Sequence, residues 1–290
     1  MKSDDFLLRV LDCEIAVRCE DKASSGLLQD CYSAFLLPAD KESRPVLSYE
    51  ISCSDQPKGW VLQCDTTAIH CRSDYDLVYE FEKDMTQRAQ LLRADLYFIH
   101  GAALSVAEHC VIISGQSGSG KSSLAWFLSH NGFAYLSDEL APVDPVSLQV
   151  EPYPHALCLK NEPLSPPPLP DSSRYTDVTI HVPAYELPTC ALDRTHALGM
   201  LIFIDRSTNR EEIIVRAIGR AESAARLYSN GLNQLAHQAD GLPAVSKIAG
   251  AVPAYLLSGG TVEERGRIIQ ELCDSVYPDK LKLTEDTAGR

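Results

Sequence analysis

The stretch CVIISGQSGSGKSS, residues 110–123, decides the fold expected of this chain. Residues 115–122 match the pattern G-x-x-x-x-G-K-[ST] in full. The match directly follows an apolar, strand-like run and directly precedes a segment whose apolar residues have helical spacing. A chance glycine-serine turn would have to reproduce both the motif and this context. We therefore predict a phosphate-binding P-loop between a strand and a helix.

The loop carries the groups that a nucleoside triphosphate needs. Gly115, Gly118 and Gly120 let the backbone bend so that its N–H groups and the following helix N-terminus point at phosphate oxygens. Lys121 can neutralise charge on the β- and γ-phosphates, and the Ser122 hydroxyl can bind Mg²⁺. The residues that we assign to nucleotide binding are Gly115, Ser117, Gly118, Ser119, Gly120, Lys121, Ser122 and Ser123.

Two acids follow the next strand along the chain. Residues 133–136 read as a short apolar strand, and Asp138 and Glu139 come soon after it. Ligands of such sheets gather at the carboxyl ends of the strands. One acid can hold Mg²⁺ directly or through water, while the other accepts a proton from an attacking hydroxyl. The alternative, a solvated turn or helix cap, is weaker this close to a P-loop.

The spacing of residues does not decide whether His100 and Lys160 have functional or structural roles. His100 ends the strand that precedes the loop strand, a position where a lone histidine is more often structural than functional. Lys160 could bind phosphate, or it could be a surface lysine whose stem lies along apolar side chains.

A small N-terminal domain is expected over residues 1–95. Residues 46–72 contain three strand-like runs with polar breaks, VLSYEISC, WVLQCD and TAIHCR, which predict a mainly antiparallel sheet. Ser73, with Asp76 three residues on, starts a linking helix whose apolar residues recur at helical spacing.

A P-loop kinase domain is expected over residues 96–278. Strand, glycine loop, helix and strand within about 30 residues predict a right-handed βαβ unit with parallel strands. Proline density predicts an exposed irregular loop at 163–188, either a flap beside a site or a surface insertion, and residues 279–290 form a polar tail. Other expected elements are strands at 198–204, 213–216 and 254–257 and helices near 221–228 and 261–273.

Composition excludes several classes of partner. The formal net charge is −14, from 26 basic and 40 acidic side chains, and no local basic patch offsets it, so we expect no nucleic-acid and no membrane partner. The ten cysteines include no CxxC pair, which favours reduced thiols over structural zinc. The acidic N-terminal stretch does not resemble a signal peptide, and we expect a cytoplasmic protein.

Four segments together resemble the HPr kinase/phosphorylase superfamily, most closely its smaller HPr-kinase-related branch, which includes lasso-peptide kinases. The segments are IHGAAL at 99–104, GQSGSGKSS at 115–123, LSDELAPVDP at 136–145 and PHALCLKNEP at 154–163. The resemblance is good over residues 95–163 and diffuse over 198–273. It implies an α/β fold with a P-loop core like that of HPr kinase and phosphoenolpyruvate carboxykinase, a mixed sheet with helices, and transfer of the γ-phosphoryl group of ATP to a serine hydroxyl.

Residue by residue, the family's histidine falls on His100 and its first acid on Asp138. The second acid, an aspartate in HPr kinases, is Glu139 here, as in the related branch. The resemblance implies that His100, Asp138 and Glu139 are catalytic, with Asp138 as the best candidate for general base. It also implies Mg²⁺ bound by Ser122 and Glu139, although the longer acid leaves open which carboxylate serves the metal.

The chain departs from the family in two places. His155 stands where an arginine is expected before Lys160, and the arginine-glycine signature for a protein substrate is not recognisable around residues 177–186. We therefore do not expect HPr itself as the substrate. The favoured acceptor is a serine on a peptide or protein, such as a lasso-peptide precursor, and a homo-oligomer is compatible with the family. The alternatives are a kinase of a free serine-type metabolite, a P-loop NTP hydrolase or switch, and a non-catalytic ATP-binding module.

Overall fold

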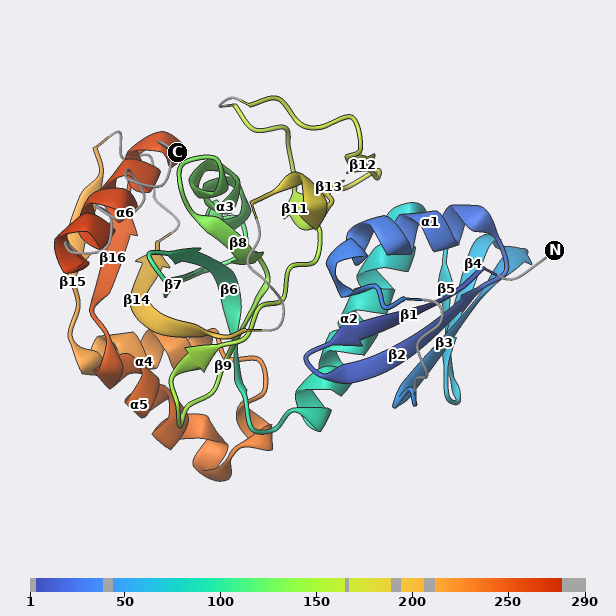
Figure 1. Ribbon diagram of the computed structural model, residues 1–290, viewed down its shortest axis with the longest axis horizontal. Coiled ribbons are helices and arrows are strands. Elements are labelled where there is room, and N and C mark those ends of the chain that lie inside the picture. The colour runs from blue at the N-terminus through green and yellow to red at the C-terminus, as the bar shows by residue number, and fades with distance from the viewer. Residues whose placement is uncertain (1–3, 39–43, 165–166, 189–193, 206–211, 278–290) are drawn as a thin grey trace, which may run out of the picture. The chain divides into compact units, whose positions relative to one another are not determined.

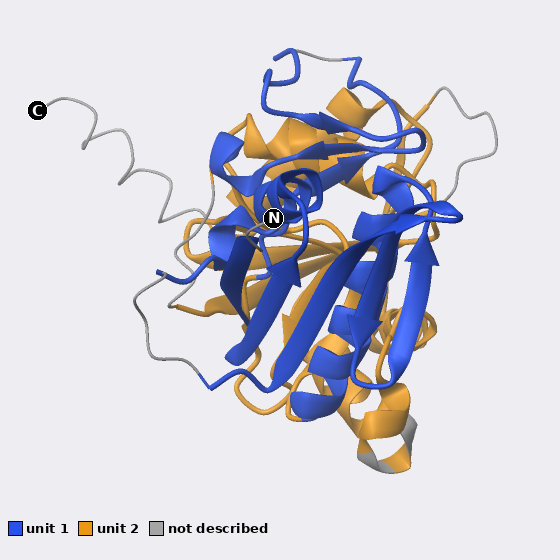
Figure 2. Ribbon diagram, turned by 90° about the vertical axis from the view of Figure 1, so that its right-hand side faces the viewer, with its two compact units in different colours: residues 1–94, 153–187 blue, residues 95–152, 188–290 orange. Residues whose placement is uncertain are grey.

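The structure is a computed structural model that describes residues 4–38, 44–164, 167–188, 194–205 and 212–277. The chain forms two compact units, which Figure 2 shows in different colours. Unit 1 consists of residues 1–94 and 153–187, and unit 2 consists of residues 95–152 and 188–290. Residues 153–187, which the sequence analysis grouped with the P-loop, thus belong to the unit that contains the N-terminal residues.

Unit 1 contains a five-stranded sheet in the order β1-β2-β3-β4-β5, in which only the β2–β3 pair is parallel. Every second side chain of β2 is buried, as expected for a strand with one face on a core. The strands are β1 Asp4–Val10, β2 Cys13–Cys19, β3 Leu47–Asp55, β4 Lys58–Cys64 and β5 Thr67–Cys71. Its helices are α1 Lys22–Cys31, η1 Ser33–Phe35, α2 Asp74–Leu92 and η2 Ala184–Glu186. Strands β3, β4 and β5 and helix α2 were expected from the sequence, whereas β1, β2 and α1 were not.

Helix α2 begins where the sequence indicates. The Ser73 hydroxyl accepts a hydrogen bond from the Asp76 N–H at 3.2 Å, while the Asp76 carboxylate accepts from the Arg72 N–H at 2.9 Å. In a capping box this carboxylate would accept from the N–H of the N-cap residue, Ser73. Here it accepts from the preceding residue, Arg72. Leu77 and Phe81 are fully buried on the apolar stripe, so this helix contributes to the core of unit 1.

The proline-rich segment is less irregular than expected. Unit 1 contains a second sheet of three strands, in the order β11-β13-β12. The strands are β11 Leu157–Leu159, β12 Arg174–Tyr175 and β13 Ile180–Val182. The side chains of β13 are buried, so the expectation of an irregular loop over 163–188 is wrong at its C-terminal end. Pairing with β11, which precedes the prolines, overrides the local composition.

Unit 2 contains an eight-stranded mixed sheet that follows the path β10-β9-β6-β7-β14-β16-β15, with β8 paired to β6 and β10 also paired to β14. Its strands are β6 Tyr97–Val106, β7 His109–Gly115, β8 Ala134–Ser137, β9 Leu140–Val143, β10 Gln149–Val150, β14 His196–Ile204, β15 Ile214–Ala217 and β16 Ala254–Ser258. Its helices are α3 Lys121–Ser129, α4 Arg220–Ser229, η3 Gln234–Ala236, η4 Gln238–Gly241, α5 Leu242–Ala251 and α6 Val262–Val276. Figure 1 shows α3 and α6 on one face of this sheet and α4 and α5 on the other.

The βαβ unit at the P-loop differs from the prediction. Strand β6 is antiparallel to both β7 and β8, so β7 and β8 point the same way without being neighbours. The acids were expected to follow a strand adjacent to the loop strand, but β6 forms a tight hairpin with β7 and lies between β7 and β8. Ala107 and Glu108 make its turn with φ of 48° and 66°, the left-handed backbone of a two-residue hairpin loop. The other neighbour of β7 is β14, in parallel.

A buried cluster joins helices α4 and α5 to one face of the sheet of unit 2. It contains Ile112 of β7, Phe203 of β14, Leu227 of α4 and Ile248 of α5, all 2% exposed or less. Helix α5 was not expected from the sequence, and the expected polar tail, residues 279–290, lies outside the described part. No helix among the described residues is long and apolar enough to cross a bilayer.

Candidate functional site

The P-loop joins the end of β7 to the start of α3. Gly118 and Gly120 have φ of +77° and +94°, values in the left-handed region that a side chain disfavours, which explains glycine at both positions. Gly120 is also the N-cap of α3, and no side chain caps this helix. An uncapped N-terminus leaves backbone N–H groups directed at the loop, so it is suited to bind an anion.

Lys121 lies in this loop as the motif requires. It is 7% exposed, and its Nζ donates to the carbonyl oxygens of Gly115 at 2.9 Å and Gln116 at 3.4 Å. The ammonium group is therefore held at the first two residues of the loop. Ser119 Oγ is buried and has no hydrogen-bond partner within the described part of the chain, so a phosphate oxygen would satisfy it.

The remaining assigned loop residues differ in exposure. Ser117 and Gly118 are exposed at the tip, whereas Ser122 and Ser123 are half-buried on the first turn of α3. This turn directly follows the uncapped helix start, where an anion would bind.

Arg265 of α6 forms a hydrogen bond with the backbone of the loop. This residue was not identified from the sequence. Its Nη1 donates to the Ser119 carbonyl at 3.0 Å, and its Nε donates to the Gly259 carbonyl at 2.7 Å. Burial lowers the pKa of Arg265 from its usual value. No sequence spacing could reveal this contact, because 146 residues separate the partners.

The acid pair and the P-loop lie at the same edge of the sheet. The Glu139 carbonyl accepts from the Gly101 N–H at 3.2 Å, and Gly101 is opposite Ser114, the residue before the loop. Two strand spacings, about 10 Å, therefore separate the backbones of Glu139 and Ser114. The acids follow β8 as expected, but β6 lies between them and the loop strand.

Two of the three predicted catalytic residues, His100 and Glu139, come close together at this edge. The Nδ1 atom of His100 lies 3.3 Å from Oε2 of Glu139, whose side chain is 42% exposed. Asp138 is fully buried, and its Oδ1 accepts from the Tyr135 hydroxyl at 3.1 Å. The histidine thus pairs with the second acid, while the first is held by a tyrosine of β8, the strand that precedes it.

Electrostatics connect His100 to the loop. Burial and the nearby Lys121 charge lower its pKa, whereas Glu139 raises it, and the net direction is downward. The imidazole is therefore neutral at pH 7. The charges of both Lys121 in the loop and Glu139 on the acid side thus act on the same imidazole.

The residues fit Mg²⁺ held together with phosphates. Within the described ranges, no group of three or more His, Cys, Asp and Glu side chains forms a metal site. Mg²⁺ usually takes one or two protein oxygens and completes its shell with phosphate and water. Ser122, Asp138 and Glu139 supply hard oxygen ligands of this kind at one sheet edge, and Glu139 is the more accessible acid.

A third acid, Asp205, lies at the level of the loop and was not identified from the sequence. Strand β14 is the direct parallel neighbour of β7, with Ile204 opposite Gly115, so Asp205 follows at the level of the loop. The signal was available, because a run of apolar residues from Leu201 to Ile204 ends in this aspartate. What the sequence does not reveal is that β14, rather than β8, is adjacent to the loop strand.

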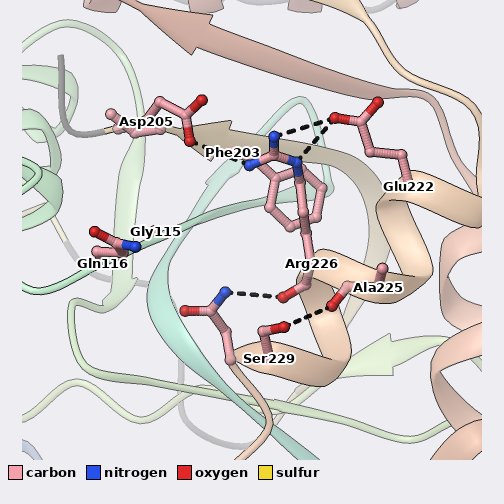
Figure 3. A pocket seen from close by; sticks show the side chains of 10 residues that line it. Gly115, Gln116, Phe203, Asp205, Glu222, Ala225, Arg226 and Ser229 are labelled. Carbon is pink, nitrogen blue, oxygen red and sulfur yellow. Dashed lines mark hydrogen bonds and ion pairs between the residues drawn. The ribbon is translucent and has the colours of Figure 1, made fainter. Parts of the chain in front are cut away.

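Asp205 lines a pocket of about 470 Å³ at the carboxyl ends of β7 and β14. Figure 3 shows Arg226 reaching from α4 into this pocket between Glu222 and Asp205. Gly115 and Gln116 of the P-loop lie on its other side. Its ten described lining residues are Gly115, Gln116, Phe203, Ile204, Asp205, Glu222, Ala225, Arg226, Ser229 and Asn230.

Lys160 and His155 belong to unit 1 rather than to the unit of the P-loop. Lys160 is exposed. His155 is 3% exposed, and its Nε2 lies 3.6 Å from a carboxylate oxygen of Glu82 within the same unit.

Comparisons with known proteins give little further information. No family model matches the sequence, and no curated protein matches it. Among solved structures, the chain is similar to the HPr(Ser) kinase/phosphatase from Coxiella burnetii, with a TM-score of 0.32 and 13% sequence identity. The match covers 64% of this chain and 98% of that chain. A TM-score this low does not establish a shared fold, so the function is inferred from the site.

Proposed function

We propose that this chain is an ATP-dependent kinase that transfers the γ-phosphoryl group to a serine-type hydroxyl. One observation carries the proposal: a complete phosphate loop with an uncapped helix start lies at the same sheet edge as Asp138, Glu139 and His100. Transfer to a hydroxyl needs both halves, since the loop binds the phosphates and a carboxylate accepts the proton.

The residues divide the work as follows. The serine oxygen attacks the γ-phosphorus, the bond from that phosphorus to the β-γ bridging oxygen breaks, and ADP leaves. Asp138 accepts the hydroxyl proton from a buried position held by Tyr135. Lys121 and the N–H groups at the start of α3 stabilise the negative charge on the phosphates. Mg²⁺, when bound, neutralises part of the same charge.

His100 and Glu139 form the second part of the acid side. A neutral imidazole next to Glu139 forms no ion pair with this carboxylate, which stays available to a metal ion. If His100 became protonated, the pair would turn into an ion pair and would hold this carboxylate more tightly. We therefore assign the metal to Glu139 with Ser122, and the proton to Asp138.

A serine in a peptide or protein is the favoured acceptor, as in precursor-modifying kinases. This part rests on the resemblance of residues 95–163 to the HPr-kinase-related branch. A free serine-type metabolite is the other acceptor of the same chemistry.

The test is incubation of the full chain with γ-labelled ATP, Mg²⁺ and serine-containing peptides. We expect the labelled phosphoryl group to appear in the peptide, or in free serine if the acceptor is a small molecule. Release of free phosphate at equal rates with and without every acceptor would instead indicate a hydrolase, and no turnover at all would indicate a binding module. Lys121→Ala serves as the inactive control, because it removes the cation from the loop without touching the acids.

A further inference from the structure

Arg226 lines the pocket beside the P-loop and has no role in the phosphoryl transfer proposed above. It is the only basic side chain among the described residues that line the 470 Å³ pocket beside the P-loop. Its guanidinium carbon lies 6.0 Å from the centre of the Phe203 ring, so the side chain extends from α4 across the end of β14. Figure 3 shows this extended arrangement.

The pocket lies at the γ-phosphate end of the loop. A P-loop lysine reaches the β- and γ-phosphates. Here the Lys121 ammonium is bonded to the carbonyl oxygens of Gly115 and Gln116, and these same two residues form one wall of the pocket. On the opposite side of β7, the His100 N–H donates to the carbonyl of Asn230, another lining residue. The pocket thus borders the two residues whose carbonyl oxygens hold the lysine, and one of its lining residues bonds the backbone of His100.

Carboxylates hold Arg226 in this position. Its Nε donates to Glu222 at 3.1 Å and its Nη1 donates to Asp205 at 3.2 Å. Glu222 is held in turn by Arg216 of β15, through two hydrogen bonds of 2.8 and 2.7 Å. The pKa of Glu222 is lowered to about 2, mainly by Arg216, so this carboxylate is charged at any working pH.

We infer that Arg226 is a cation for the terminal phosphoryl group, supplied by the chain itself from helix α4. A guanidinium at the γ end stabilises the charge that spreads over the transferring group, and its planar fork suits phosphate oxygens. Glu222 and Asp205 are positioning residues for it. A phosphate that replaces Asp205 as partner would leave the contact to Glu222 in place. This inference rests on the proposed nucleotide site.

The test compares two ligands that differ only at the terminal phosphate. Calorimetric titration with Mg²⁺ and either the β,γ-imido analogue of ATP or ADP gives two dissociation constants for each variant. For Arg226→Ala we expect the affinity for the imido analogue to fall roughly tenfold, with the ADP affinity unchanged within about twofold. Arg226→Lys, which keeps the charge but not the fork, is expected to lie between the wild type and Arg226→Ala.

Arg220→Ala is the matched control, because Arg220 also lies on α4 but bonds the Ser246 carbonyl outside the pocket. Equal losses for both ligands, or no loss for either, would overturn the role of Arg226. If the wild-type chain bound neither ligand, the proposed nucleotide site would fail first and this inference with it. Arg226→Ala is expected to fold, since Arg216 still pairs with Glu222 and Asp205 is half exposed.

Discussion

Asp138 and Glu139 are adjacent in the sequence but differ in surroundings. Asp138 is buried and accepts a hydrogen bond from Tyr135, whereas the side chain of Glu139 is 42% exposed and pairs with His100. A base must be held in one orientation, and a metal ligand must be reachable from the phosphate side. These two environments support the proposed division of roles, with Asp138 as the base and Glu139 as the metal ligand.

Asp138→Asn removes the proton acceptor and preserves the size of the side chain. We expect the rate of phosphoryl transfer to fall by roughly 10²–10⁴-fold, with ATP affinity within severalfold of the wild type. Tyr135→Phe is the control, because it deletes the hydroxyl that bonds Asp138 and leaves the carboxylate in place. Turnover retained in Asp138→Asn would show that another group is the base.

The lowered pKa of His100 predicts the pH dependence of transfer. Since burial and Lys121 hold this pKa below the usual 6.5, the imidazole stays neutral down to a lower pH than an ordinary histidine. We expect kcat/KM to fall only below pH 6.5, when protonated His100 pairs with Glu139, and His100→Gln to abolish this acid limb. A limb at or above pH 6.5, or one that persists in His100→Gln, would contradict this role.

At the scale of elements, the site depends on which strands are neighbours. The β6–β7 hairpin places His100 beside the loop strand, β14 brings Asp205 to its other side, and α6 supports the loop through Arg265. Motif and strand positions could be predicted from apolar runs and glycines. Strand order could not, because it depends on contacts between distant segments, such as the pairing of Ile204 with Gly115.

Arg265→Ala tests whether α6 positions the loop. Loss of the bond to the Ser119 carbonyl should loosen a backbone that holds the phosphates common to ATP and ADP. We expect both affinities to weaken together by several-fold, unlike the selective loss expected for Arg226→Ala. Gln270→Ala, on the same helix but bonded to Asn131, should leave both affinities unchanged. A loss confined to ATP would place Arg265 at the γ-phosphate instead.

Strand β13 predicts a pH-dependent stability of unit 1. Burial, followed by the nearby His155 charge, lowers the pKa of His181 from 6.5 to about 4. The unfolded chain therefore binds more protons than the folded chain between pH 4 and 6.5, and the free energy of unfolding rises with pH over that window, by about 3 kcal/mol from this residue. Denaturant titrations should show a smaller rise in His181→Gln. An unchanged pH dependence in that variant would exclude His181 as its source.

At the scale of the whole molecule, the chain leaves unit 1 at residue 94, forms the loop and the acid pair, and returns to unit 1 at residue 153. The sequence predicted a small N-terminal β domain and a P-loop region, and both groups of strands are present. It did not predict the return of residues 153–187, because local proline content says nothing about the pairing of β13 with β11. Every catalytic candidate and the pocket of Arg226 lie in unit 2.

The central claim is that a triphosphate binds in the bend formed by residues 115–122. Hydrogen exchange of the full chain, with and without saturating Mg²⁺ and the β,γ-imido analogue of ATP, tests it most directly. We predict slower exchange at the backbone amides of residues 116–123, with the amides of strands β3 to β5 unchanged, and no such protection in Lys121→Ala. Protection confined to unit 1, or unchanged exchange at residues 116–123 in the wild type, would contradict the account.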